Sequence, residues 1–298
     1  MGAAAAAGVI VMGALVAAGI SQGWLSPQGG AKRLLIAAQH DAAHGRLPEA
    51  QATLERLIGQ HPDSPWTDDG LLALGGVYEQ TTKLVEARSV YRMLLEKFPS
   101  SPLLNQAQAR LGAVNVAILF SPTVTEFDTT YEVQPGDTLG NLAQRFSTTI
   151  ETIQRANGIT GDVIRLKQKL KVPKGHFSVV VDKSSNQLLV TEDNQFFKAY
   201  PVATGKDNAT PEGTFKIVNK IPNPVWYKQG AAVPPESPDN VLGTRWMGFD
   251  KKGYGIHGSV DPSDIGKYVT AGCVRLTNAD VEELYAILPV GTDVTIVQ

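Results

Sequence analysis

The sequence predicts a multidomain chain: an α-helical repeat, then a small strand–helix–helix–strand unit, then a mainly β domain. Three observations predict this order. A helical segment is duplicated with a 37-residue period, a Pro-Gly turn leads into two short amphipathic helices, and apolar residues alternate with period two from Phe177 onward. At 298 residues the chain has room for about two domains of ordinary size, or for more if some are small.

Composition excludes several kinds of site. Lys and Arg number 27 and Asp and Glu 29, so the net charge of −2 provides no basic surface for nucleic acid. The one cysteine, Cys273, rules out an intrachain disulfide and a multi-cysteine metal site. We therefore expect no metal, no cofactor and no nucleic-acid partner.

Residues 1–30 are predicted to be a signal peptide or a membrane anchor. Residues 1–31 carry no charged side chain, and residues 3–20 are only Ala, Gly, Val, Ile, Leu and Met. A helix of about 20 such residues spans a bilayer core, while Val16 and Ala18 offer a small-residue cleavage site. A buried Ala/Gly helix is the alternative. The pattern favours export to the periplasm or cell wall, with membrane contact only through this segment.

Paired helices are predicted over residues 31–120. The pattern Leu-x-Glu-Ala at 47–50 recurs at 84–87, and the Pro-rich break at 61–65 recurs at 98–102. Two helices per period, followed by a capping helix, resemble a tetratricopeptide array, although a duplicated helical hairpin bundle would give the same pattern. The resemblance implies spacing, or binding of a protein partner on a concave face.

After a linker at 121–129, residues 130–174 form the second predicted module. A strand leads into the turn at 135–138, two short helices follow, and Asn157-Gly158 ends the second helix before a closing strand. This unit, with its Gly-Asp-Thr-Leu sequence, resembles a LysM domain, a family that binds N-acetylglucosamine-containing glycans such as peptidoglycan. Four glycan-binding residues are implied: Gly136, Asp137, Thr138 and Asn157. Helix capping alone would also explain Asp137 and Thr138, and Lys167 stands where the family usually has glycine.

Period-two alternation predicts a mainly β domain over residues 176–298. The expected strands are 177–182, 187–191, 196–203, 214–218 and 294–297. One amphipathic helix is expected before the last strand, capped by Thr277 or Asn278.

Cys273 lies in a sequence that suits a nucleophile. Gly272 removes a side chain beside the sulfur, and Arg275 adds a positive charge that favours a thiolate or binds a carboxylate. A cysteine nucleophile needs a base, and His257, 16 residues upstream and followed by Gly258, is the candidate. No role is expected for the other histidines: His40, His44, His61 and His176.

His-Gly-Ser at 257–259 followed by Thr-Ala-Gly-Cys-Val-Arg at 270–275 resembles the signature of the L,D-transpeptidase (YkuD-like) catalytic domain. That signature is a His-Gly pair and then Ser/Thr-x-Gly-Cys-x-Arg, and supporting matches extend from about residue 177 to residue 298. Ala271 stands where many members have a second histidine, which leaves His257 as the base.

The resemblance implies a peptidoglycan enzyme that forms 3→3 cross-links between stem peptides through a thioester on Cys273, with LysM holding the glycan strand. The implied catalytic residues are Cys273, His257, Gly258, Ser259 and Gly272. A carbonyl of Gly258 or Ser259 would fix the imidazole tautomer, and N–H groups around Gly272 and Cys273 would form the oxyanion hole. The implied substrate-binding residues are Arg275, Thr270, Trp226 and Tyr227. A structural salt bridge is the alternative for Arg275, and cleft walls or core are the alternative for Trp226, Tyr227 and Trp246.

Other activities remain open at this point. The same acyl-enzyme could act as an L,D-carboxypeptidase or attach a protein to peptidoglycan. Cysteine hydrolases of the NlpC/P60 kind place the cysteine before the histidine, and sortases have a longer gap and a more distant arginine. A non-catalytic cell-wall scaffold is the alternative of another class, but it would not require Cys273 and His257 in matched glycine-rich contexts.

Overall fold

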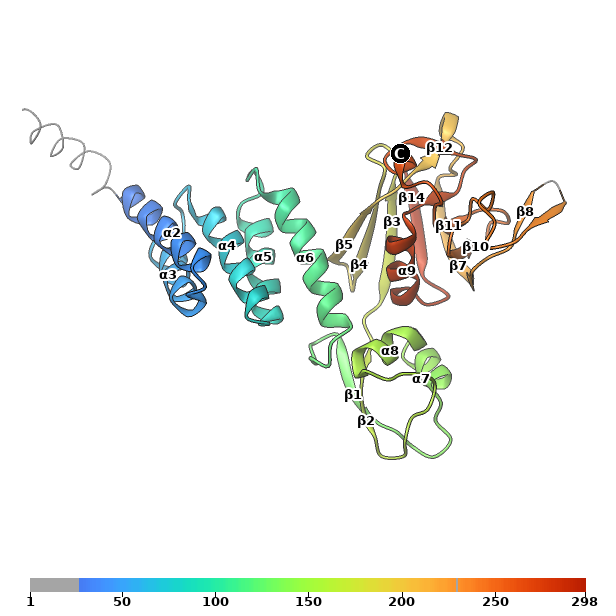
Figure 1. Ribbon diagram of the computed structural model, residues 1–298, viewed down its shortest axis with the longest axis horizontal. Coiled ribbons are helices and arrows are strands. Elements are labelled where there is room, and N and C mark those ends of the chain that lie inside the picture. The colour runs from blue at the N-terminus through green and yellow to red at the C-terminus, as the bar shows by residue number, and fades with distance from the viewer. Residues whose placement is uncertain (1–26, 229) are drawn as a thin grey trace, which may run out of the picture. The chain divides into compact units, whose positions relative to one another are not determined.

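The computed structural model describes residues 27–228 and 230–298 (Figure 1). The chain divides into two compact units between Val114 and Asn115. The predicted signal peptide or anchor at residues 1–30 lies, apart from its last four residues, outside the described residues. Within the described ranges, no helix is both long and apolar enough to cross a membrane.

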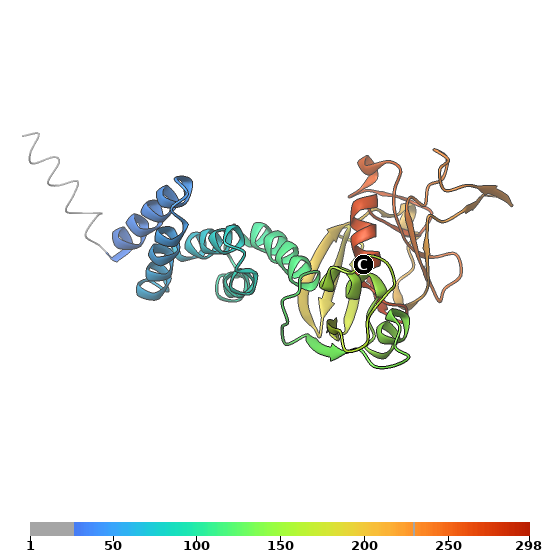
Figure 2. The ribbon, with the colours of Figure 1, turned by 60° about the horizontal axis from the view of Figure 1, so that its bottom comes forward.

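The first unit is a succession of helices (Figure 2). They are α2 (Pro27–Ala43), α3 (Leu47–Gln60), α4 (Thr67–Gln80), α5 (Leu84–Lys97) and α6 (Leu104–Leu119), whose last residues belong to the second unit. The duplicated motif explains the repeat, because α3 and α5 each begin at its leucine. Close packing of α4 on α5 requires Gly75, where a Cβ atom would lie 2.2 Å from the Tyr91 ring.

The second unit begins with the small module. Strand β1 (Asp128–Glu132) pairs antiparallel with β2 (Lys169–Pro173), and α7 (Leu139–Arg145) and α8 (Ile150–Asn157) come between them in the sequence. Thr138 and Thr149 cap the two helices by accepting backbone N–H groups. Their apolar faces bury Leu142 and Ile153 against the strands. The predicted strand–helix–helix–strand order is confirmed.

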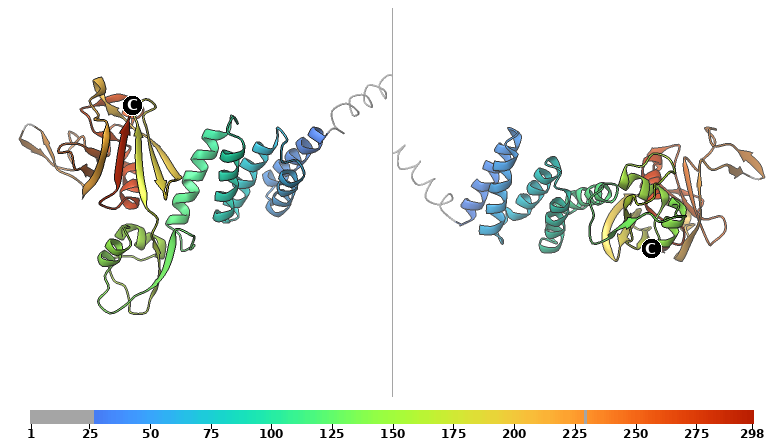
Figure 3. Two further views of the ribbon diagram at one scale, coloured as in Figure 1. Left: turned by 180° about the vertical axis from the view of Figure 1, so that it is seen from behind. Right: turned by 90° about the horizontal axis from the view of Figure 1, so that it is seen from below.

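The rest of the second unit is a β domain. Its eight-stranded sheet has the order β13-β11-β10-β7-β14-β3-β4-β5. The strands are β3 (Phe177–Asp182), β4 (Gln187–Glu192), β5 (Gln195–Pro201), β7 (Gly213–Pro222), β10 (Arg245–Phe249), β11 (Gly255–His257), β13 (Val274–Arg275) and β14 (Asp293–Val297). Neighbours are antiparallel except for β14 with β3 and β11 with β13; Figure 3 shows β14 beside β3. Two small sheets pair β6 (Thr204–Gly205) with β12 (Tyr268–Thr270), and β8 (Trp226–Lys228) with β9 (Ala231–Val233).

Helix α9 (Asn278–Ile287) packs on this sheet, and Thr277 caps it. Val281 and Leu284 of α9 share one buried core with the strands, and Val116 and Leu119 from the end of α6 join the same core. The predicted helical module therefore ends in the core of the second unit.

Contacts with the LysM-like module complete the C-terminal end of α9. The last carbonyls of a helix have no partner within the helix. The hydroxyls of Thr149 and Thr152 both donate to the Ala286 carbonyl, the latter at 2.7 Å, and Lys220 Nζ donates to the Tyr285 carbonyl at 2.6 Å. The two threonine bonds join the LysM-like module to the β domain, and the Lys220 bond comes from β7 of the β domain itself.

Candidate active site

Two short neighbouring strands bring Cys273 and His257 together. Strands β11 and β13 are parallel, with His257 beside Arg275 and Ile256 beside Val274. One step earlier in this register, Cys273 lies beside Gly255. The pairing therefore brings the backbone at Cys273, one residue before β13, next to the strand that ends at His257, across a sequence separation of 16 residues. Because side chains alternate along a strand, the register favours the same face of the sheet for Cys273 and His257.

His257 is held as a neutral base. Its Nδ1 lies 2.7 Å from the Gly258 carbonyl oxygen, which can only accept, so Nδ1 carries the proton and Nε2 keeps its lone pair. Burial lowers the pKa of His257 to about 4, with the Arg275 charge adding to the effect and the Gly258 hydrogen bond opposing it. Of the two predicted carbonyls, Gly258 therefore fixes the tautomer.

Cys273 is partly buried beside two backbone groups. Its Sγ donates to the Gly253 carbonyl at 3.6 Å and accepts a hydrogen bond from the Gly255 backbone. Burial raises the pKa of the Cys273 thiol; the Gly255 hydrogen bond and the Arg275 charge act in the opposite direction without overcoming it. The Arg275 charge favours the thiolate, as expected from the sequence, but burial of Cys273 outweighs it, so the net shift of the Cys273 pKa is upward.

Arg275 forms the predicted alternative, a salt bridge. Its Nη1 lies 2.6 Å from Asp264 Oδ2, with the Arg275 side chain 15% exposed. Arg275 also pairs with Ala203 through both backbone groups, N–H to carbonyl at 2.9 Å and 2.8 Å. Its Nε is buried without a hydrogen-bond partner. The guanidinium therefore braces the loop that carries Asp264.

The turn before Cys273 depends on Gly272 and Thr270. Gly272 has φ +129°, and a Cβ atom there would lie 2.7 Å from the Tyr254 ring and 2.8 Å from the Ala209 carbonyl oxygen. The Thr270 hydroxyl donates to the Cys273 carbonyl at 2.7 Å and accepts the Gly272 N–H at 3.2 Å. The Thr270 hydroxyl, predicted to bind substrate, and the Gly272 N–H both form their hydrogen bonds within this turn.

Asn278 is a site residue that the sequence suggested only as a helix cap. Cβ atoms at Gly258 and at Gly243 would each lie 2.2 Å from Asn278 Oδ1, which accepts the Thr244 N–H at 3.1 Å. Asn278 thereby supports the backbone of Gly258 that orients His257. In the sequence, this role is signalled by the pair Gly243 and Gly258, whose missing side chains make room for the Asn278 amide.

Ser259 is bound within its own loop, where its hydroxyl donates to the Asp261 carbonyl at 2.7 Å.

The aromatic residue against His257 is Trp246, whose ring is stacked on the imidazole with centroids 6.1 Å apart. Trp246 Nε1 donates to Asn219 Oδ1 at 3.1 Å, which fixes the indole. The predicted contacts Trp226 and Tyr227 lie on the β8–β9 hairpin, where Tyr227 is 72% exposed.

The four glycan-binding candidates cluster only in part. Asp137 accepts the Gln134 N–H at 2.7 Å and the Tyr131 hydroxyl at 2.8 Å, and these bonds hold the pKa of its carboxyl below the usual range. Thr138 caps α7 by accepting the Asn141 N–H at 3.1 Å. Gly136 has φ +84° and lines the same turn.

Asn157 lies elsewhere in the module and ties α8 to β2. Its side chain donates to the Ile153 and Lys171 carbonyls and accepts the Lys171 N–H at 2.8 Å. Lys167 has φ +66°, the left-handed conformation that favours glycine. The departure from the family pattern therefore falls where the backbone calls for a glycine.

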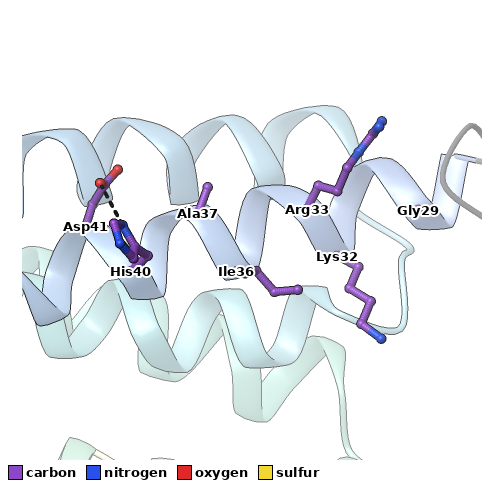
Figure 4. A pocket seen from close by; sticks show the side chains of 7 residues that line it. All are labelled: Gly29, Lys32, Arg33, Ile36, Ala37, His40 and Asp41. Carbon is purple, nitrogen blue, oxygen red and sulfur yellow. Dashed lines mark ion pairs between the residues drawn. The ribbon is translucent and has the colours of Figure 1, made fainter. Parts of the chain in front are cut away.

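A hollow of about 690 Å³ lies in the first unit on α2 (Figure 4). It is lined by Gly29, Lys32, Arg33, Ile36, Ala37, His40 and Asp41, none of them a predicted catalytic residue. Across the described ranges, no cluster of three or more His, Cys, Asp or Glu side chains could hold a metal ion.

Three protein families match the chain in the predicted order. Residues 17–64 and 69–101 match the tetratricopeptide repeat, residues 131–173 the LysM domain, and residues 176–296 the L,D-transpeptidase catalytic domain. The predicted fold class and the family resemblance are confirmed.

Two relatives give the same result. A Bacillus subtilis protein named putative L,D-transpeptidase YqjB is 46% identical over 124 residues, covering 40% of this chain and 69% of that protein. A Bacillus licheniformis protein named putative L,D-transpeptidase YkuD is 36% identical over 174 residues, covering 56% of this chain and 97% of that protein. A solved L,D-transpeptidase from Mycobacterium smegmatis aligns with TM-score 0.36 and 20% identity, covering 44% of this chain and 64% of that one.

Proposed function

Since the chain belongs to the L,D-transpeptidase family, we propose that it is a cysteine-dependent enzyme that forms 3→3 cross-links between peptidoglycan stem peptides. One observation carries the proposal. Cys273 directly precedes β13, which pairs in parallel with the strand that ends at His257, and the Gly258 carbonyl leaves Nε2 of His257 as the proton acceptor.

Acylation begins with proton transfer from the Cys273 thiol to His257 Nε2. Sγ then attacks the carbonyl carbon of the third stem residue, and the oxygen takes up the negative charge. The Cys273 N–H is the donor for this oxyanion, since the Gly272 N–H already donates to Thr270. Collapse of the intermediate breaks the amide bond, and the imidazolium returns its proton to the departing D-alanine amine.

The thioester is then resolved by a nucleophile. In the proposed reaction an amine on a second stem attacks the thioester carbonyl, gives a proton to His257 and releases the Cys273 thiol. Water in place of that amine gives carboxypeptidase activity, and a protein amine gives protein attachment to peptidoglycan. Incubation of the purified protein with a tetrapeptide donor and mass spectrometry of the muropeptides separates these outcomes. A 3→3 linked dimer is expected; absence of any D-alanine release would refute the proposal.

The LysM domain is proposed to tether the enzyme to its polymeric substrate outside the cytoplasm. A bound glycan raises the effective concentration of stem peptides near Cys273 without new contacts at the site. Loss of glycan binding should therefore lower activity on intact sacculi much more than on a soluble tetrapeptide. Deleting the module would also remove the Thr149 and Thr152 hydroxyls from the Ala286 carbonyl of α9.

The deletion therefore needs a stability control. Thr152→Val removes one of the bonds to α9 while retaining the LysM domain and the Thr149 cap of α8, so it measures the part of the structural effect that comes through this bond. The tethering proposal expects this variant to retain activity on sacculi better than the deletion does. Equal losses on sacculi and on tetrapeptide in the deletion would contradict tethering.

The helical repeats are proposed to bind a protein partner, which would place the enzyme within the wall-building machinery. Their helices carry none of the candidate catalytic residues. Deleting residues 31–102 should leave tetrapeptide turnover unchanged, and a fall in that turnover would contradict this division of roles.

A further inference from the structure

Lys183 is a buried lysine in the turn between β3 and β4. Its side chain is 3% exposed. Its Nζ donates to Asn208 Oδ1 at 2.5 Å, to Glu212 Oε1 at 2.8 Å and to the Thr210 carbonyl at 3.3 Å. A buried ammonium group is stable only when its N–H groups donate hydrogen bonds to nearby acceptors. These three acceptors all belong to residues 206–212, so the ammonium anchors that segment from inside the domain.

The anchored segment has a conformation that needs support. Asp207 has φ 51° and Asn208 has φ 61°, values that residues with a side chain rarely adopt. Lys183 binds the side chain of Asn208 directly. The Thr210 hydroxyl accepts the Gly205 N–H at 2.7 Å and closes the turn from the other side.

This turn lies against the backbone next to the nucleophile. The Ala209 carbonyl oxygen is so close to Gly272 that a Cβ atom on Gly272 would lie 2.8 Å from it. The residue before Cys273 is therefore wedged between Ala209 and the Tyr254 ring. A second link runs from the same strand region to Lys183 itself, because the hydroxyl of Tyr268, on the strand leading to Thr270, donates to the Lys183 carbonyl at 2.9 Å.

We propose that Lys183 is a positioning residue for acyl transfer: by holding the 206–210 turn against Gly272, it fixes the backbone N–H of Cys273 toward the developing oxyanion. Lys183 itself does not touch the substrate, because its ammonium is enclosed by the turn. The proposal rests on the proposed function, since an oxyanion forms only when Cys273 attacks a carbonyl.

The test separates oxyanion stabilisation from thiol reactivity. Lys183→Met removes the ammonium and keeps a side chain of similar length. Loss of one aligned oxyanion donor lowers kcat by about 10²-fold, so we expect kcat on the tetrapeptide to fall by about 10- to 100-fold. Alkylation of Cys273 by iodoacetamide forms no oxyanion, and its rate should stay within about 2-fold. Cys273 is the chain's one thiol, so intact mass reports this rate directly.

Lys216→Met is the matched control, because it removes the same charge from an exposed lysine paired with Asp293 on the surface. It should leave both rates unchanged. Where Lys183→Met fails to fold, Asn208→Gly replaces it: glycine accepts the positive φ, and the substitution removes the amide that binds Lys183 and Glu212. This variant should lower kcat by a smaller factor, about 3- to 10-fold, again with alkylation unchanged.

Two outcomes overturn the proposal. One is full turnover by Lys183→Met and Asn208→Gly. The other is an equal fall of turnover and alkylation, which would mean that Lys183 only supports the fold. Inactivity of the wild-type protein would instead refute the proposed function.

Discussion

The turns at Cys273 and at Asp137 are built from similar parts but leave different atoms available. Each has a glycine of positive φ, Gly272 at +129° and Gly136 at +84°, directly before its polar residue. In the first turn a neighbour, Thr270, supplies the supporting hydrogen bonds. In the second, Asp137 itself accepts two of them.

This difference separates a reactive site from a structural one. Backbone carbonyls hold His257 and Cys273, so His257 Nε2 stays available for chemistry. Asp137, Thr138 and Asn157 use their side-chain oxygens within the fold. From residue type alone, a functional role was predicted for both turns: catalysis at Cys273 and glycan binding at Asp137. The hydrogen bonds favour chemistry at the turn of Cys273 and a structural role at the turn of Asp137.

The largest effect should come from Cys273. Cys273→Ala removes the nucleophile, and we expect turnover of the tetrapeptide to fall by about 10⁴-fold or more. Cys273→Ser should retain very little activity, because a hydroxyl is a much poorer nucleophile beside the same base. Release of D-alanine by the two variants measures this. Turnover at the wild-type rate in Cys273→Ala would contradict the assignment.

His257 should give the next largest effect and a pH signature. His257→Ala removes the base and should lower kcat by about 10²- to 10⁴-fold. In the wild type the imidazole must be neutral to accept the thiol proton. With a pKa of about 4, kcat/KM should therefore fall only as pH drops through about 4, well below the usual histidine value of 6.5. An acid limb near 6.5 would contradict the burial argument.

The same pKa predicts a pH-dependent stability. Between pH 6.5 and about 4 the unfolded chain binds a proton at His257 that the folded chain does not. Stability is therefore complete above pH 6.5 and decreases as pH falls toward 4, by roughly 3 kcal/mol from this group. His257→Gln should remove that slope from unfolding measured by denaturant at several pH values.

The sequence predicted the modules well because their signals are local. Helix periodicity, the duplicated Leu-x-Glu-Ala and the two-residue alternation of 177–182 each act within a few residues, and the structure has these elements at the expected positions. The strands around Cys273 were not predicted. Strands β11 and β13 have three and two residues, too short for any alternation, and only pairing with distant partners defines them.

Contacts between residues distant in the sequence also determine the roles of the site residues. The roles of Asn278 and Trp246 depend on contacts with Gly258 and with the His257 ring, which lie far along the chain. Desolvation of Cys273 likewise comes from the assembled fold, and it raises the pKa of the thiol against the lowering effect of Arg275 that the sequence suggested.

Asn157→Ala should sharpen the contrast between the turn at Cys273 and the structural side chains of the LysM domain. It leaves the Lys171 N–H without its acceptor and removes two donated bonds, so we expect a loss of about 2 kcal/mol in the free energy of unfolding of the LysM domain. Glycan binding by the folded fraction and tetrapeptide turnover should stay unchanged. Asn141→Ala, at an exposed helical site, is the control. Lost glycan binding with unchanged thermal melting would show that Asn157 contacts the glycan.

The smallest effect should come from Lys167→Gly, and its sign is the test. Lys167 is exposed with φ +66°, where a Cβ atom costs about 1–2 kcal/mol, while glycine gives back part of this gain through the freedom of its unfolded chain. We expect the LysM domain to gain about 0.5–1 kcal/mol. Lys169→Gly is the matched control, an exposed lysine in β2, where extended backbone gives glycine no advantage and the same substitution should destabilise by about 0.5–1 kcal/mol. Urea unfolding of both variants measures the difference. Equal destabilisation would mean that Lys167 compensates its backbone strain with its side chain; opposite signs would mean that the chain carries lysine there at a cost in stability.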